Sequence, residues 1–270
     1  NNNLANIKKS IFFLNKNDCV AIPTETVYGL AANAYSSKAV KKIYALKKRP
    51  KNNPSIVHYL SLNQLKKDCE LNRDFFILYK KFCPGPITFV LKLKKGSRIS
   101  KIVTNNKKTV AVRFPKNKLT QRLLKFLNYP LAAPSANIST NISPVSAEDV
   151  KEEFGKKIKF ILNDGISKVG LESTIINLVK KPEILRHGGI EIEKISKALK
   201  KKIKFKSKKN KILVPGQARV HYSPHIPIRL NAKNPFKDEA YLLIKKRKLK
   251  NRNYFYLTKN KNLKEAGKNL

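Results

Sequence analysis

The chain has 270 residues, of which 41% are hydrophobic, and it carries a formal net charge of +42. This length accommodates one large domain, or one domain with a small second one. The absence of a long apolar run excludes a membrane span. Three cysteines (Cys19, Cys69 and Cys83) show no CxxC spacing, so we expect a protein of the reducing cytoplasm without disulfides.

The excess of positive charge has two interpretations that the sequence leaves open. It is typical of a protein that contacts nucleic-acid phosphates. It is also typical of compositional drift, because lysine dominates and accompanies abundant Asn and Ile. Only ten of the 59 basic residues are arginines, and arginine is the residue that binds phosphate or carboxylate through a planar fork. We therefore single out Arg49, Arg113, Arg186 and Arg219.

Helical and strand patterns alternate irregularly over residues 1–202, and this predicts one α/β domain with a twisted mixed sheet and flanking helices. Ser36 or Ser37 is expected to cap a helix, and Ser146 precedes a first turn rich in acids. The expected helices are 3–16, 36–48, 72–82, 118–127, 146–154 and 190–202. The expected strands are 18–24, 55–60, 87–93, 109–115, 130–134, 159–164, 173–179 and 183–186.

Residues 203–228 read as a linker or functional loop, because they are basic and broken by Pro215, Gly216 and Pro224. Residues 229–270 contain two strand patterns and the start of a helix. About 45 residues of this kind do not bury a core alone. We therefore predict a second small α/β domain that is cut short in this chain.

Standard enzyme motifs are missing: there is no GxxxxGK[ST], GxGxxG, HExxH or GxSxG. His221 and His225 are four residues apart, but Pro224 prevents a helical metal-binding pair, so we expect no metal ligand set. What remains is a series of polar stretches at strand ends: PTETVYGLAANA (23–34), KKRPKNNPSIVH (47–58), TVAVRFP (109–115), APSANIST (133–140), GLEST (170–174) and ILRHGGI (184–190).

Each stretch has an ordinary structural explanation as well as a functional one. A helix cap explains one threonine of PTETVYG, but not Thr24, Thr26 and Tyr28 together. A cationic helix end explains Lys47, whereas a histidine in a strand is often simply a core residue. Arg113 is costly among apolar strand residues unless an anion pairs with it. Together, these Lys, Arg, Ser, Thr and Asn residues favour binding of several anions and electrostatic stabilisation at a phosphorus centre.

The motifs PTETVYGL, KKRPKNNPSIVH, CPGPITFVL, TVAVRFP, APSANIS, SPVSAEDV, GLESTI and ILRHGGI occur in this order. The chain thereby resembles the YrdC-like threonylcarbamoyl-AMP synthases over about residues 15–228. PGQARVHYSPHIPI is similar to the linker of the long, two-domain form of that family. The tail loosely resembles the start of that form's small Rossmann-like domain. The resemblance implies residues 1–202 as catalytic domain, 203–228 as a linker crossing the active site, and 229–270 as a partial C-terminal domain.

The resemblance also implies a reaction: L-threonine, bicarbonate and ATP give threonylcarbamoyl-AMP and pyrophosphate, for modification of tRNA next to the anticodon. Mg²⁺ would be held through the ATP phosphates. A downstream tRNA threonylcarbamoyltransferase complex would use the product. Residues implied for threonine are Thr26, His58, Arg113, Ala133 and Ser173. Residues implied for ATP are Lys47, Arg49, Asn53, Thr109, Ser135, Ser143, Arg186, His221 and Tyr222.

Two other hypotheses remain open at this stage. A non-catalytic RNA-binding module would explain the +42 charge, which exceeds what the family's chemistry needs, and direct tRNA binding is compatible with either function. Another carbamoyl-transfer enzyme would use the same domain, although such enzymes usually carry zinc-finger or acylphosphatase domains that this chain lacks. The residue that acts as catalytic base is not identified.

Overall fold

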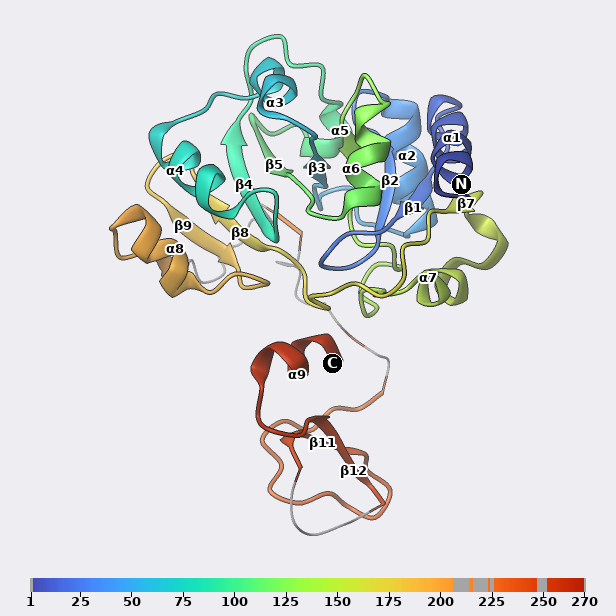
Figure 1. Ribbon diagram of the computed structural model, residues 1–270, viewed down its shortest axis with the longest axis vertical. Helices are drawn as coiled ribbons and strands as arrows, with labels where there is room; N and C mark the ends of the chain where they lie inside the picture. The colour runs from blue at the N-terminus through green and yellow to red at the C-terminus, as the bar shows by residue number, and fades with distance from the viewer. Residues whose placement is uncertain (1, 206–213, 216–222, 224–225, 247–251, 270) are drawn as a thin grey trace.

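The computed structural model describes residues 2–205, 214–215, 223, 226–246 and 252–269. Within them, one large sheet has the strand order β10-β9-β8-β4-β5-β3-β6-β2-β1-β7 (Figure 1). Its strands are β1 (Val20–Ile22), β2 (Gly29–Asn33), β3 (Ile56–His58), β4 (Ile87–Lys92), β5 (Thr109–Arg113), β6 (Leu131–Ala132), β7 (Phe160–Ile161), β8 (Thr174–Asn177), β9 (Glu183–Arg186) and β10 (Lys204–Phe205).

Helices flank this sheet, and a smaller unit follows it. The helices are α1 (Asn2–Asn15), α2 (Ser37–Leu46), α3 (Leu62–Asp68), α4 (Arg73–Phe82), α5 (Lys101–Thr104), α6 (Lys118–Lys125), α7 (Ala147–Phe154), the 3₁₀ turn η1 (Gly155–Lys157) and α8 (Ile192–Leu199). The smaller unit contains β11 (Tyr241–Lys245), β12 (Tyr254–Thr258) and α9 (Leu263–Asn269). Figure 1 shows it grouped apart from the large sheet.

The predicted mixed α/β fold is confirmed. β3 runs parallel to β5, and β4 runs antiparallel to β5 but parallel to β8. Predicted caps are also present: Ser36 accepts a hydrogen bond from Ala39 N at the start of α2, and Ser146 forms a capping box with Asp149 at α7. The sequence patterns did not predict β2, α3, α5, η1 and β10.

The two faces of the sheet are covered differently. One face packs against α2, α3, α4, α5, α7 and α8 in the main hydrophobic core. On the other face, α1 and α6 cover only the end around β1, β2 and β6. Further along this second face, a small apolar cluster joins Ile56, Ala111, Ile175 and Val214. Side chains alternate between the faces of a strand, so His58 and Arg113 lie on the same face as Ile56 and Ala111.

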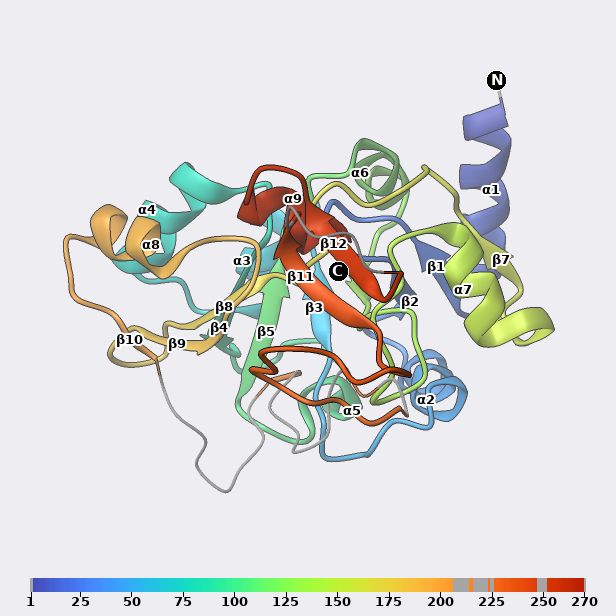
Figure 2. The same ribbon diagram turned by 90° about the horizontal axis from the view of Figure 1, so that it is seen from below.

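Figure 2 shows α9, β11 and β12 in front of the large sheet, and the small unit touches the large one at the loop that precedes β8. A Cβ added to Gly170 would lie 2.7 Å from the carbonyl oxygen of Gly267 in α9, so backbone packs directly on backbone there. β11 and β12 pair in parallel, and α9 packs on β12. Among the described residues, no helix has the length and apolar character needed to cross a bilayer.

Candidate active site

A small cavity opens on the second face of the sheet, between the loop after β1 and the ends of β3, β5, β8 and β9. Its volume is about 40 Å³, with room for about three water molecules. The register of the strands explains the convergence: His58 pairs with Arg113, and Arg113 pairs with Thr88. Lining residues are Thr24, Thr26, Val27, Tyr28, Gly29, Arg49, Ile56, His58, Arg113, Ala133, Pro134, Ser135, Glu172, Ser173, Arg186 and Pro215.

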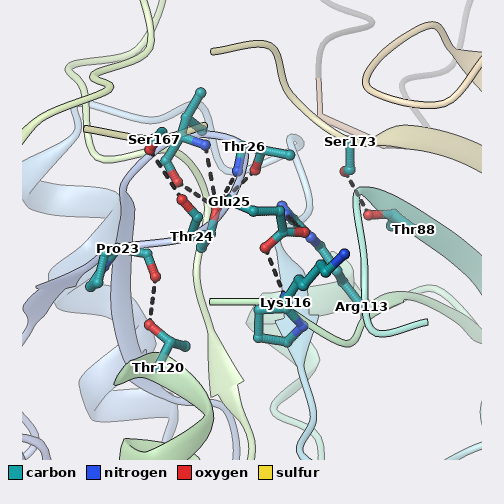
Figure 3. Close-up of polar contacts among 12 residues, drawn as sticks. Pro23, Thr24, Glu25, Thr26, Thr88, Arg113, Lys116, Thr120, Ser167 and Ser173 are labelled. Carbon is teal, nitrogen blue, oxygen red and sulfur yellow. Dashed lines mark hydrogen bonds and ion pairs between the residues drawn. The ribbon is translucent and has the colours of Figure 1, made fainter. Parts of the chain in front are cut away.

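Arg113 forms a buried ion pair at the centre of the site. Its Nη2 donates to Glu25 Oε1 at 2.6 Å, and the two side chains are only 5% and 8% exposed (Figure 3). The other carboxylate oxygen, Glu25 Oε2, accepts from the backbone N–H of Lys116 at 2.8 Å. The anion that the sequence analysis required for Arg113 is therefore supplied by the chain itself, from the loop between β1 and β2.

Two polar atoms in the cavity wall lack partners. Arg113 Nε and His58 Nδ1 are both buried and have no hydrogen-bond partner among the described residues. Burial lowers the pKa of His58 from 6.5 to about 3, and the neighbouring Arg113 charge acts in the same direction, whereas the backbone of Ile56 and Leu131 opposes it. The imidazole is thus neutral at pH 7. Buried polar groups normally have partners, so two partnerless polar atoms on residues that line one cavity are unusual.

The threonines of the loop after β1 form an ordered chain of hydroxyls. Thr24 Oγ1 donates to the carbonyl of Val27 at 2.7 Å and lies 2.8 Å from Thr26 Oγ1. A hydroxyl has one proton, and that of Thr24 is used on Val27, so Thr26 must be the donor to Thr24. The lone pairs of Thr26 consequently remain as acceptors for a donor group in the cavity.

A second buried ion pair lies on the neighbouring strands. Arg186 Nη1 donates to Glu172 Oε2 at 2.7 Å, while Arg186 Nε and Nη2 donate to the carbonyl oxygen of Ser173. Arg186 Nη2 also donates to Ser173 Oγ at 3.1 Å, and that hydroxyl lies 2.7 Å from Thr88 Oγ1. Glu172 Oε1 accepts from the Ser143 hydroxyl at 3.0 Å. This network fixes the side of the cavity opposite Thr26.

Lys47 and Arg49 connect the end of α2 to the loops around the cavity. The Lys47 ammonium is 1% exposed and donates to the carbonyl of Ser135 at 2.6 Å and to that of Asn137. Burial lowers its pKa well below the ordinary value, with a further contribution from the Arg49 charge. Arg49 donates to Asn53 Oδ1 at 2.8 Å and to the carbonyl of Pro54 at 2.7 Å.

The structure brings most of the predicted residues together. Thr26, Arg49, His58, Arg113, Ala133, Ser135, Ser173 and Arg186 line the one cavity. Lys47 and Asn53 lie behind it and hold its loops, while Ser143 lines a second cavity of about 530 Å³ beside α7 and α9. Thr109 lies at the opposite end of β5 from Arg113, about 13 Å away along the strand. His221, Tyr222 and Arg219 fall outside the described residues.

Three residues of the site were missed by the sequence analysis: Glu25, Glu172 and Thr88. The requirement for an anion beside Arg113 was visible, but its source was not, because Glu25 is 88 positions away in the chain. Acids are scarce here, with 17 Asp and Glu in total. The available signal was a glutamate within each hydroxyl-rich motif, Glu25 in PTET and Glu172 in GLEST.

Comparison with known proteins places this fold and site in a family. The model of the Sua5/YciO/YrdC family, whose description reads "Telomere recombination", matches residues 13–188. A second model, "Threonylcarbamoyl-AMP synthase, C-terminal domain", matches residues 190–270. The chain therefore belongs to the Sua5/YciO/YrdC family, as its motifs predicted.

Individual relatives support the same assignment. The threonylcarbamoyl-AMP synthase of Pyrococcus abyssi is 43% identical over 189 residues, which is 69% of this chain and 55% of that protein. The Schizosaccharomyces pombe threonylcarbamoyl-AMP synthase is 38% identical, covering 84% of this chain and 63% of that one. The crystal structure of P. abyssi Sua5 complexed with L-threonine matches with a TM-score of 0.88 and 34% identity, over 97% of this chain and 82% of that one. In the two sequence comparisons, the chain thus spans less than two thirds of the length of the P. abyssi and S. pombe synthases.

Proposed function

We propose that this chain carries L-threonylcarbamoyladenylate synthase activity, a nucleotidyl transfer from ATP. The observation that carries the proposal is the pair of partnerless buried atoms, Arg113 Nε and His58 Nδ1, in the wall of one cavity. A cavity of about 40 Å³ is too small for a nucleoside triphosphate, so only the small substrate is assigned to it. The family membership and the named relatives support the same activity.

Threonine would lie in this cavity. Its carboxylate would accept from Arg113 Nε, a charge-assisted hydrogen bond of the strong kind. Thr26 offers lone pairs to a donor on the ligand, and the neutral His58 adds one further polar atom. Ser173 and the backbone of Ala133 line the remaining wall.

ATP would lie on the open side, where Arg49, Arg186, Ser135 and Ser143 face the two neighbouring cavities. Lys47 and Asn53 would act there by holding the loops, and Thr109, His221 and Tyr222 complete the proposed set. Mg²⁺ would accompany the phosphates, its common mode in nucleotide sites; among the described residues no three His, Cys, Asp or Glu side chains gather into a metal cage.

The proposed chemistry has two steps. L-Threonine would bind as the zwitterion, and after its ammonium group has lost a proton the amine adds to bicarbonate, forming the N–C bond of a carbamate and releasing water. A carbamate oxygen then attacks the α-phosphorus of ATP, and the bond between the α-phosphorus and the α,β-bridging oxygen breaks, so that the β- and γ-phosphates leave as pyrophosphate. Arg49 and Arg186, which line the cavity, would stabilise negative charge at the phosphorus, and positioning would supply the rest.

The proposal extends to the organisation of the chain and its setting. Residues 1–202 would form the catalytic domain, 203–228 a linker crossing the active site, and 229–270 part of a C-terminal domain. Two described linker residues favour this, since Pro215 lines the cavity and Val214 packs on the sheet beside it. The product would pass in the cytoplasm to a tRNA threonylcarbamoyltransferase complex.

The test is release of pyrophosphate by the purified chain with ATP, bicarbonate and L-threonine. We expect release that requires both L-threonine and bicarbonate, with threonylcarbamoyl-AMP detected by mass spectrometry. Pyrophosphate release in the absence of threonine, or no release at all, would contradict the proposal. The variant Arg186→Gln removes the charge beside Glu172 but keeps a polar side chain. It should raise the KM for ATP in the same assay.

An RNA-binding module remains the second candidate, favoured only by the +42 charge. It predicts tight RNA binding that weakens steeply with salt and needs neither ATP nor threonine. Filter binding of a tRNA from 50 mM to 200 mM salt, with wild type and Arg113→Lys, separates the two functions. Binding unaffected by the substitution, together with no pyrophosphate release, would favour the module.

A further inference from the structure

Glu25 occupies an unusual position for an acid in this chain. It is 8% exposed and, in the described part of the chain, stands behind Arg113 and outside the wall of the cavity. Both of its carboxylate oxygens are used: Oε1 by Arg113 Nη2 and Oε2 by the backbone N–H of Lys116. Its own carbonyl accepts from Val169 N at 2.8 Å. Figure 3 shows the carboxylate between the loop after β1 and the end of β5.

This geometry decides which part of Arg113 faces the ligand. A guanidinium group is planar and rigid, so fixing one Nη in an ion pair fixes the direction of its other N–H bonds. Because Nη2 is committed to Glu25, the rest of the guanidinium fork, including the partnerless Nε, is held in one orientation beside the cavity. Without Glu25, the side chain would be free to swing and present any edge.

Glu25 also balances charge. Arg113 and Glu25 together are neutral, and a zwitterionic amino acid is neutral as well. The pair therefore presents a hydrogen-bond donor to the carboxylate without an uncompensated positive charge beside the ligand amine. An excess positive charge there would favour simple anions over amino acids.

We infer that Glu25 is a positioning residue that orients Arg113 for recognition of the amino-acid carboxylate. This inference rests on the proposed function, because it assumes that L-threonine occupies the cavity. It deepens that function by assigning a residue to amino-acid specificity that touches no substrate atom.

The variant Glu25→Gln tests the two contacts of the carboxylate at unchanged side-chain size. Both Glu25 oxygens face N–H donors, one from Arg113 and one from Lys116. A Gln side chain has one oxygen and one NH₂ group, so it fits one donor and places a donor against the other. Glu25→Gln therefore keeps size and shape but breaks one of the two contacts. Glu25→Asp keeps the charge but is one methylene shorter and does not reach both donors.

The experiment measures L-threonine and ATP binding separately by calorimetry for wild type, Glu25→Gln and Glu25→Asp. We expect the Kd for L-threonine to rise at least about tenfold in Glu25→Gln, equivalent to about 1.4 kcal/mol, with the Kd for ATP within twofold of wild type. The same criterion applies to Glu25→Asp if Glu25→Gln does not fold. Chloride is expected to compete with threonine in Glu25→Gln and not in wild type.

Asp68→Asn is the matched control for loss of a buried carboxylate. Asp68 is 1% exposed and accepts from the hydroxyls of Tyr35, Tyr59 and Ser97, remote from the cavity wall. We expect it to lower the Tm without changing threonine affinity. A smaller threonine effect in the Glu25 variants, or an equal loss for ATP, would overturn the inference. Failure of the wild type to bind threonine would instead overturn the proposed function.

Discussion

Because His58 is buried and neutral, we can predict how the stability of the protein changes with pH. The pKa of this buried imidazole is about 3 in the folded protein and 6.5 when exposed. Between these values the unfolded chain binds a proton that the folded chain does not, so stability falls as the pH is lowered through that range. From pH 7 to pH 4.5 this one residue accounts for a loss of about 2–3 kcal/mol.

Urea unfolding at pH 7 and pH 4.5 measures this loss. His58→Gln removes the titrating group, so its stability should fall by about 2–3 kcal/mol less than that of the wild type over the same interval. All other titrating groups are common to both proteins and cancel in the difference. Equal losses for the two proteins would refute the claim that His58 is buried and neutral beside Arg113.

Three further predictions concern the walls of the site. Arg113→Lys keeps the charge but loses the rigid fork, so the KM for threonine should rise by about 10- to 100-fold, corresponding to about 1.5–3 kcal/mol; an unchanged KM in pyrophosphate-release assays would contradict this. Lys47→Met strips the carbonyls of Ser135 and Asn137 of their donor, and urea unfolding should show a loss of about 1–3 kcal/mol, so wild-type stability would count against the loop-holding role. Gly188→Ala places a Cβ 2.2 Å from the carbonyl oxygen of Glu172, and calorimetry should show destabilisation of about 3 kcal/mol, whereas an unshifted Tm would exclude this close packing.

Much of the fold followed from local sequence signals. Helices such as α4 and α6 have clear apolar stripes and polar caps, and Ser36 and Ser146 mark their helix starts as expected. β2 was missed because GLAAN lacks the β-branched residues that identify strands, and its pairing with β1 depends on a turn through the PTET loop. α3 is only seven residues long and escapes any test of periodicity.

The site was predictable in its components but not in its connections. Scarcity of arginine pointed to Arg49, Arg113 and Arg186, and all three line the cavity. Their partners Glu25 and Glu172 were not found, because strand order rather than sequence distance brings them together. For Lys47 the residue was predicted but its contacts were not. Its ammonium group donates to two loop carbonyls, and no sequence pattern reveals these partners. The domain boundaries at 202 and 228 stay predictions.

The contact of α9 with the large sheet has a consequence for the cavity wall. Gly170 and Gly267 meet without side chains between them, and Gly170 N donates to the carbonyl of Thr26. Glu172 and Ser173 follow directly along the same loop. Displacing α9 would uncover the backbone of a loop whose next residues line the cavity, so the contact with α9 supports that part of the cavity wall.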